Sequence, residues 1–268
     1  MEYKDLDLDV KDASQLRIRA GRHLQQWVLV NAQGRIIRIE ETMKDQFPVW
    51  LSEIDAKDSL EVAIMLPALG QTWIPEVLYD PNVQEVYSRY VDGLSFIEAD
   101  RIDVSAIQAK SIYRSDRYLT KALLKHFPQS TLHVPLNNMV QGYASYFKTH
   151  SASGFVIDLF DGEAMFLYFK NGDFQFHQQV EFDEIGDLAY ALLLVQNELQ
   201  VELSSMECFV SGAVSQHDHT YQLLNSLFYE IKDAPVDAIA NVNVFDTFEQ
   251  LTNYFSLLVP VLYAHHRG

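Results

Sequence analysis

The chain has 268 residues, of which 48% are hydrophobic, so it can bury a sizeable core and is long enough for two domains. Its 37 acidic and 20 basic residues give a formal net charge of −17. That charge opposes binding to nucleic acid or to an anionic bilayer, because both bind proteins through cationic side chains.

The sequence shows no sign of export or of a membrane span. Its start, Met1 to Asp9, is acidic where a secretory signal is basic and then apolar. The most apolar stretches, 188–195 and 255–264, are shorter than the roughly 20 residues that cross a bilayer. The single cysteine, Cys208, excludes an internal disulfide and fits a reducing compartment. We therefore expect a cytoplasmic protein.

The first elements form an antiparallel meander. Residues 1–14 are a polar lead-in, either a tail or an edge strand. Gly21 marks the first corner of the meander and Gln33-Gly34 marks the second. The sequence predicts that these corners separate strands over Leu16–Ala20, Gln25–Asn31 and Arg35–Glu40.

The rest of the first half alternates strands and helices. Glu61–Leu66 is a buried strand that ends at Pro67. Glycine and prolines make Leu69–Arg89 irregular, apart from a short helix over Asn82–Tyr90. The patterns that follow predict a strand at Ala109–Tyr113, a helix at Arg117–Phe127, a strand at Thr131–Val134 and a helix at Asn137–Lys148.

A second meander begins after a linker-like stretch at 150–154. Asp161-Gly162 and Asn171-Gly172 are two-residue hairpin signals, because both pairs tolerate the positive φ angles of a type I′ turn. They separate strands over Phe155–Phe160, Glu163–Lys170 and Asp173–Glu181.

Helices and one strand complete the second half. Asp183–Gln200 is an amphipathic helix, followed by a strand at Glu207–Ser211. Ser215 can cap a helix that runs to Tyr229, with Asp218 near its first turn. A last helix begins at Asp246 and is kinked or shortened by Pro260. The inward stripe of the first of these helices is expected to be Ile185, Leu188, Ala189, Leu192 and Leu199.

The two meanders are one long-period repeat. An offset of 138 residues places Gly34 on Gly172 and Trp27–Val30 on Met165–Tyr168. A single repeat of this kind predicts two similarly built lobes rather than a solenoid. We expect a first lobe over 1–150, with an inserted segment around 67–108, and a second lobe over 151–268.

This layout resembles the actin-like ATPase superfamily, in particular its PilM-like and type II secretion L-like branch. It also resembles an uncharacterised Bacteroidetes family with that fold. The likeness rests on Leu16–Glu40, Ile74–Asp80, His126–Pro128, Phe155–Phe182 and Glu207–Ala213. The resemblance implies an α/β fold of two RNase H-like lobes, each opening with a three-stranded antiparallel meander followed by alternating helices and strands. Since members polymerise or dimerise, it also implies possible self-association.

Active members hold phosphate in a glycine-containing loop after an aspartate, one in each lobe, and adenosine in a later glycine-rich turn. In the second loop Asp158 keeps the acid that orients magnesium or water, but Phe160 stands where a glycine is expected. In the first loop Arg19 replaces the acid. The nucleotide-cleft candidates implied by the resemblance are Asp158, Asp161, Gly162, Gly21 and Gly212.

Each candidate has a plainer interpretation. Asp158 with Asp161 is either a magnesium-linked pair or an inward polar residue beside a hairpin turn. Arg19 and Arg22 either contact a phosphate or pair with surface carboxylates. The histidines 217, 219, 265 and 266 show no spacing typical of a metal site. The tyrosines 79, 87, 90, 113 and 118 form either a partner surface or half-buried packing.

The degraded loops favour a degenerate, non-catalytic actin-like protein that acts as a cytoplasmic interaction or scaffold module. In that interpretation there is no catalytic residue and no cofactor, and the partner is another protein or a second copy. The alternative is an ATP-binding protein with magnesium, a slow ATPase or a small-molecule kinase that uses Asp158.

Overall fold

The chain forms two compact units in the computed structural model. The described residues are 2–5, 7–54, 60–83, 86–87, 91, 98–100, 107–150, 152–212, 214, 218–239 and 251–259. Of these, residues 2–141 form unit 1, and residues 142–239 with 251–259 form unit 2. The chain passes from one unit to the other inside helix α3, Pro135–His150. The lobe boundary between residues 150 and 151 stays a prediction.

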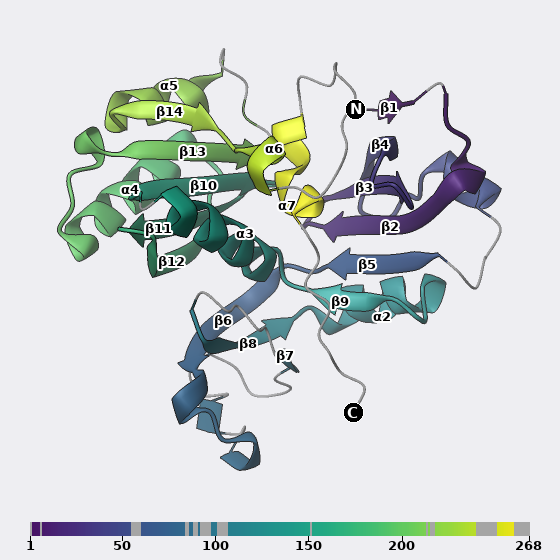
Figure 1. The fold of residues 1–268 in the computed structure, drawn as a ribbon, viewed down its shortest axis with the longest axis horizontal. Helices are drawn as coiled ribbons and strands as arrows, with labels where there is room; N and C mark the ends of the chain where they lie inside the picture. The colour runs from purple at the N-terminus through teal and green to yellow at the C-terminus, as the bar shows by residue number, and fades with distance from the viewer. Residues whose placement is uncertain are drawn as a thin grey trace. The chain divides into compact units, whose positions relative to one another are not determined.

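Unit 1 is built on a six-stranded sheet in the order β1-β4-β3-β2-β5-β9 (Figure 1). Strands β2, β3 and β4 form the predicted antiparallel meander, and β5 and β9 extend it with parallel pairs. Helix α2, Arg117–His126, packs Leu119 and Leu123 into the core on one sheet face. The strands are β1 Glu2–Lys4, β2 Ala13–Ala20, β3 Leu24–Asn31, β4 Ile36–Met43, β5 Glu61–Met65 and β9 Thr131–His133.

A second, three-stranded sheet lies between β5 and α2 in the sequence, in the order β6-β8-β7. Its strands are β6 Ala68–Pro75, β7 Glu98–Asp100 and β8 Ala109–Ser115. The prediction that this segment is irregular from Leu69 is wrong over β6. Gly70 sits at a register shift where a Cβ would lie 2.7 Å from the Val91 carbonyl oxygen, and Pro75 is the last strand residue. Both residues mark special positions in a strand rather than its absence.

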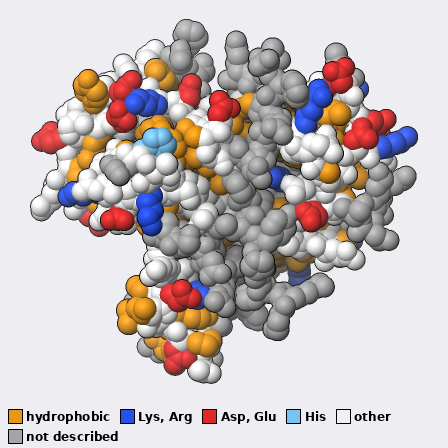
Figure 2. Space-filling model, viewed as in Figure 1, with side chains coloured by type: hydrophobic (Ala, Val, Ile, Leu, Met, Phe, Trp, Pro, Cys, Tyr) orange, Lys and Arg blue, Asp and Glu red, His pale blue; other side chains and the backbone are white. Residues whose placement is uncertain are grey.

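Short 3-10 helices follow β6 and carry exposed apolar side chains. They are η3, Glu76–Leu78, and η4, Pro81–Val83. Val77 is 89% exposed and Leu78 is 69% exposed. Hydrophobic side chains gather over this segment in Figure 2. Within the predicted helix 82–90, the structure describes a helical turn at 86–87 and a 3-10 turn at its start, and 84–85 and 88–90 lie outside the described residues.

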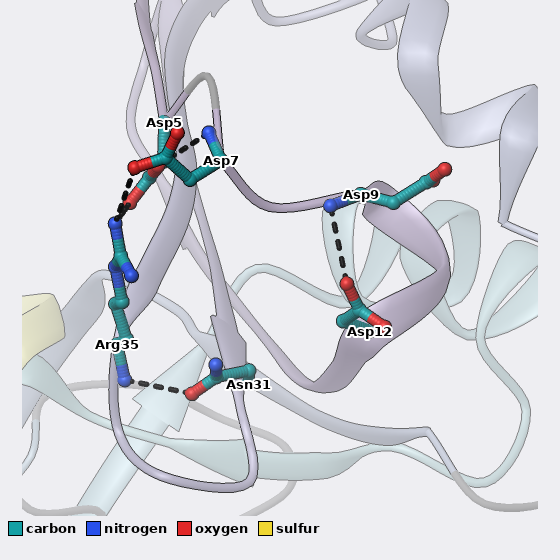
Figure 3. A network of polar contacts seen from close by, with 6 residues as sticks. All are labelled: Asp5, Asp7, Asp9, Asp12, Asn31 and Arg35. Atoms are coloured by element: carbon teal, nitrogen blue, oxygen red, sulfur yellow. Dashed lines mark hydrogen bonds and ion pairs between the residues drawn. The ribbon is translucent and has the colours of Figure 1, made fainter.

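The polar lead-in is an edge strand rather than a tail. Strand β1 pairs antiparallel with β4, and a 3-10 helix, η1, Val10–Asp12, leads into β2. Figure 3 shows Arg35, at the β3–β4 turn, reaching Asp5 just after β1, with 2.6 Å between Nη2 and Oδ2. The Arg35 backbone N–H also donates to the Asn31 side chain over 2.9 Å. These contacts fasten β1 onto the sheet.

Unit 2 has a five-stranded sheet in the order β12-β11-β10-β13-β14. The predicted meander is confirmed, and both turns have the expected type I′ signature: φ is +53° and +78° at Asp161-Gly162 and +54° and +87° at Asn171-Gly172. Strand β14 was not predicted, because its four residues include three charged ones. The strands are β10 Gly154–Phe160, β11 Glu163–Lys170, β12 Asp173–Glu181, β13 Glu207–Gly212 and β14 Glu230–Asp233.

Helices cover both faces of this sheet (Figure 1). Helices α4, Ile185–Leu199, and α5, His219–Leu227, pack on the face of Phe155 and Ile157. The end of α3 packs on the other face, where Phe147 stacks on Phe169 at 4.6 Å between ring centroids. The buried α4 stripe is Leu188, Leu192 and Val195. Leu188 and Leu192 of the predicted stripe are confirmed, whereas Ile185 is 38% exposed and the prediction is wrong there. None of the described helices is long and apolar enough to cross a membrane.

The end of unit 2 departs from the predicted caps. The N-cap of α5 is Asp218, whose side chain accepts from the Tyr221 N–H at 2.8 Å, and Ser215 lies outside the described residues. The last predicted helix is described only as a 3-10 turn and one α-helical turn, since 246–250 and Pro260 lie outside the described residues. The remaining elements are η2 Val49–Glu53, η6 Leu203–Ser205, α6 Val236–Ile239, η7 Leu251–Tyr254 and α7 Phe255–Leu258.

The repeat inferred from the sequence is present in the structure. Each unit has the same core order, in which a meander is extended by two parallel strands. Each meander has a register shift between its middle and third strands, after Leu29 against β4 and after Tyr168 against β12. Leu29 and Tyr168 are 139 residues apart, so the predicted offset of 138 is one residue short in the middle strand. Gly34 and Gly172 both have positive φ in the turn that follows.

Candidate functional site

Asp158 is buried inside the sheet of unit 2. It lies opposite Ser211 in the parallel pair of β10 and β13. The Ser211 hydroxyl donates to Asp158 Oδ1 over 2.6 Å. Asp158 is 0% exposed and Ser211 is 1% exposed. The neighbouring strand therefore supplies a short hydrogen bond to the acid that the resemblance places in the second phosphate loop.

The same sheet face is lined by aromatic side chains. Tyr143 of α3 is fully buried and packs against Phe169, Phe209 and Phe255. Burial first, and then the negative charge of Asp158, raise the pKa of Tyr143 well above its ordinary value. Its hydroxyl has no hydrogen-bond partner within the described part of the chain. Tyr143 and the three phenylalanines that it contacts thus form an aromatic layer on the sheet face that carries Asp158.

The turn after β10 separates the two aspartates. Phe160 is 5% exposed and lies two residues beyond Asp158, so both side chains point to the same sheet face. Asp161 and Gly162 form the turn itself and are half-buried. Among the described residues there is no cluster of three or more His, Cys, Asp or Glu side chains that could hold a metal ion. The predicted acidic pair therefore consists of a buried strand residue and a turn residue.

Gly212 is required by the backbone at the end of β13. Its φ is +92°, and a Cβ there would lie 1.8 Å from the Leu159 carbonyl oxygen. The Val214 N–H donates to the Gly212 carbonyl over 2.8 Å, which closes a tight turn. Ala213 lies outside the described residues. Since no side chain fits this close approach, the glycine has a structural cause that is independent of any ligand.

The corresponding residues of unit 1 have a different chemistry. Arg19 lies in β2, is 4% exposed, and pairs in register with Gln26 on β3 and Met65 on β5. The N–H of Gly21 donates to the Leu24 carbonyl over 2.8 Å and closes the β2–β3 turn. Arg22 in that turn is exposed. The first predicted phosphate loop is therefore a turn of three residues preceded by a buried arginine.

The other candidates divide into packing residues and exposed ones. Tyr87 and Tyr113 are buried, and Tyr79 stacks on Tyr87 at 5.6 Å between centroids. The Tyr87 hydroxyl donates to the Leu78 carbonyl over 3.1 Å. Tyr118 is 89% exposed. Tyr79, Tyr87 and Tyr113 are therefore packing residues, whereas Tyr118 is a surface residue and Tyr90 lies outside the described residues.

The histidine and cysteine candidates do not form a reactive site among the described residues. His219 is the first residue of α5, and His217, His265 and His266 lie outside the described part of the chain. Cys208 is buried in β13, and burial raises the pKa of its thiol well above the ordinary value. A protonated, buried thiol is a poor nucleophile.

Sequence reasoning missed the exposed apolar side of α4. Tyr190 is 65% exposed, Leu193 is 48% exposed and Leu194 is 47% exposed. The signal was present, because only Asp187 and Glu198 are charged in the helix. A helix that is apolar around its circumference is expected to be covered on every side.

Solved structures with a similar fold support the α/β assignment. A protein of Bacteroides thetaiotaomicron VPI-5482, described as having an actin-like ATPase fold and unknown function, is similar over 93% of this chain and 98% of its own, with a TM-score of 0.69 and 14% identity. A chain of the PilM–PilN type IV pilus biogenesis complex is similar over 92% of this chain and 98% of its own, with a TM-score of 0.62 and 12% identity.

At such low sequence identity, structural similarity shows the fold alone. It confirms the actin-like ATPase fold that the resemblance predicted. No curated protein matches the chain. Residues 56–231 match the family described as "Protein of unknown function (DUF3822)", and because they make up more than half of the sequence, the chain belongs to this family.

Proposed function

We propose that this chain is a degenerate actin-like protein that acts as a cytoplasmic interaction or scaffold module and does not turn over ATP. The observation that carries the proposal is the state of Asp158, which is 0% exposed and bonded to Ser211. Magnesium keeps several waters when it binds to a carboxylate in a nucleotide site. A carboxylate closed off from solvent inside a sheet is poorly placed for that role.

The residues around Asp158 support the same conclusion. A phosphate cradle needs backbone N–H groups that a phosphate can approach without a Cβ in the way. Phe160 occupies the position where such a glycine is expected, and its side chain is buried in the fold. Gly212 is retained, but its backbone geometry against Leu159 accounts for that.

A solved structure with this fold supports a protein partner. The structure that contains PilM is a complex with a second protein, PilN. A protein with an actin-like fold can therefore assemble with another protein, and we propose such a partner here in preference to a nucleotide.

Calorimetry with ATP and magnesium, together with a phosphate-release assay, tests the proposal. We expect no heat of binding and no phosphate release. Binding at micromolar ATP, with turnover that is lost in Asp158→Asn, would overturn it. Asp158→Asn keeps the shape of the side chain, and Asp161→Asn in the half-exposed turn is the matched control.

A slow ATPase or small-molecule kinase is the second candidate. It is favoured by one observation: Asp158 lies near the end of β10, just before a glycine turn, where active members have their acid. Mass spectrometry of the heat-denatured, purified protein would detect retained nucleotide. A stoichiometric adenine nucleotide would favour this candidate over the scaffold role.

A further inference from the structure

Helix α4 has two apolar sides and only one of them is buried within unit 2. Leu188, Leu192 and Val195 face the sheet and are 0% exposed. On the opposite side lie Tyr190, Leu193 and Leu194, here called the α4 face, each between 47% and 65% exposed. Surface helices normally carry charged residues on the outward side. The α4 face instead has the composition of a surface that another molecule covers.

The spacing on the outward side is that of helix-to-helix packing. Gly186, Tyr190, Leu193 and Asn197 follow one another at intervals of four, three and four residues, which places them in one seam. Open space surrounds the position of a Cβ on Gly186, with no atom of the chain within 4 Å. A second helix can therefore approach the backbone closely at this end of the seam and pack against Tyr190 and Leu193 further along.

The surroundings of the α4 face are acidic at both ends. Asp183, Glu184 and Asp187 are exposed at the beginning of the helix, and Glu198 and Glu202 are exposed at its end. No lysine or arginine occurs between Lys170 and Lys232, a stretch that contains ten Asp and Glu residues. The local field therefore attracts cations, and it repels a second copy of a chain whose net charge is −17.

We propose that the α4 face binds an apolar helix of a partner protein that carries Lys or Arg at both of its ends. The apolar seam would bury the middle of that helix, and the acidic ends of α4 would pair with its basic ends. This proposal rests on the proposed function as an interaction module, and it adds the surface and the chemistry of the partner.

The test uses a synthetic helical peptide of Leu and Ala with Lys at both ends, and a matched peptide with Glu at both ends. Fluorescence anisotropy of the labelled peptides measures binding to the full chain. We expect the Lys peptide to bind, more weakly at high salt, and the Glu peptide not to bind. Leu193→Asp should weaken binding at least about tenfold, although it adds a negative charge, because it breaks the apolar seam.

Val77→Asp is the matched control, because it adds the same charge at a residue of unit 1 that is 89% exposed. It should leave binding unchanged. Leu193→Gln keeps helix propensity, so loss of binding in both Leu193 variants, with an unchanged thermal melt, separates the seam from misfolding.

Three outcomes would overturn the proposal. Unchanged binding in Leu193→Asp would mean that charge alone holds the peptide. Equal binding of the Lys and Glu peptides would show that the partner helix needs no basic residues at its ends. A wild-type dimer in sedimentation that Leu193→Asp dissolves would assign the α4 face to a second copy. An ATPase measurement on the same wild-type sample distinguishes the two proposals. ATP turnover together with binding of the Lys peptide contradicts only the absence of catalysis in the proposed function. No binding of the Lys peptide and no ATP turnover contradict only the proposed partner helix.

Discussion

The two meanders have the same backbone plan and opposite chemistry. In unit 1 the strand pair β2–β5 places Arg19 beside Met65, and in unit 2 the strand pair β10–β13 places Asp158 beside Ser211. Arg19 and Asp158 are 139 residues apart, the same spacing as the register shifts after Leu29 and Tyr168, and each pairs with the parallel strand that follows its meander. A fold of this kind is determined by strand alternation and turn residues, so buried polar positions can change while the plan stays.

The ends of the parallel strands sharpen this contrast. Strand β5 runs on into Leu66, which is 1% exposed and donates its N–H to the His133 carbonyl over 2.9 Å. Strand β13 ends at Gly212, with positive φ against the β10 backbone. Unit 2 therefore has a glycine turn at the position where unit 1 has a core leucine. The retained glycine is explained by the fold and needs no ligand.

The largest expected effect is that of Gly212→Ala. The added Cβ would collide with the Leu159 carbonyl, and the residue would need a positive φ, so we expect a loss of about 4 kcal/mol or more in the free energy of unfolding. Urea unfolding followed by circular dichroism measures it. Gly186→Ala, in open space on α4, is the control and should gain about 0.5–1 kcal/mol. A Gly212→Ala protein as stable as the wild type would remove the backbone explanation for this glycine.

The next effect is a loss of stability in acid that both units share. Burial lowers the pKa of His133 in unit 1 and of His177 in unit 2 from 6.5 to about 4. Between pH 4 and 6.5 the unfolded chain binds more protons at these residues than the folded chain. Their contribution to stability is therefore complete above pH 6.5 and declines as the pH falls toward 4, by at most about 3 kcal/mol for each histidine.

The slope of unfolding free energy against pH measures this effect. His133→Gln and His177→Gln should each make the slope between pH 4 and 6.5 shallower, whatever they do to stability at pH 7. If only one variant changes the slope, the two units differ in how well they bury their histidines. An unchanged slope in both would show that the imidazoles are accessible to protons in the folded protein.

The hydrogen bond between Ser211 and Asp158 is worth less than the glycine turn but distinguishes the units. Ser211→Ala removes the 2.6 Å donor from a buried carboxylate, so we expect a loss of about 2 kcal/mol. The corresponding residue of unit 1 is Met65, and Met65→Leu should cost less than about 1.5 kcal/mol because it conserves volume. Thermal melts of both variants make the comparison. Equal, small losses would mean that Asp158 is satisfied without Ser211.

Much of the fold could be predicted from local signals. The hairpin pairs Asp161-Gly162 and Asn171-Gly172 fixed the second meander, because few dipeptides accept two consecutive positive φ angles. Strand β6 was missed because Gly70 and Pro75 are usually breakers. The close approach of the Val91 backbone explains Gly70, and Pro75 is tolerated because it is the last residue of the strand. The four-residue strand β14 has too few residues for a periodic signal.

The candidate site was predicted less well than the fold. Sequence position identified Asp158, but its complete burial and its bond to Ser211 depend on the pairing of strands 53 residues apart. The α4 face was not predicted, because a single buried stripe describes only one side of a helix that is apolar all round. A count of charged residues on the outward side would have found it.

The smallest expected effect concerns the edge strand that only unit 1 has among the described residues. Arg35→Met removes the ion pair with Asp5, which is 6% exposed, and should cost about 1 kcal/mol, less at high salt. Amide exchange in β1 should accelerate, because Arg35 fastens β1 to the sheet, whereas exchange in β10 should not change. Lys170→Met, at an exposed residue beside the corresponding turn of unit 2, is the matched control.

If β1 exchanges as slowly in Arg35→Met as in the wild type, its ladder with β4 holds without the charged contacts. The difference between the two sheet edges would then lie in the backbone alone. Faster exchange in β1 with little loss in global stability would instead show that β1 opens locally, as edge elements with few buried contacts commonly do. In that case the lead-in is an addition to a meander that is complete without it, which is the arrangement of unit 2, where the described sheet ends at β12.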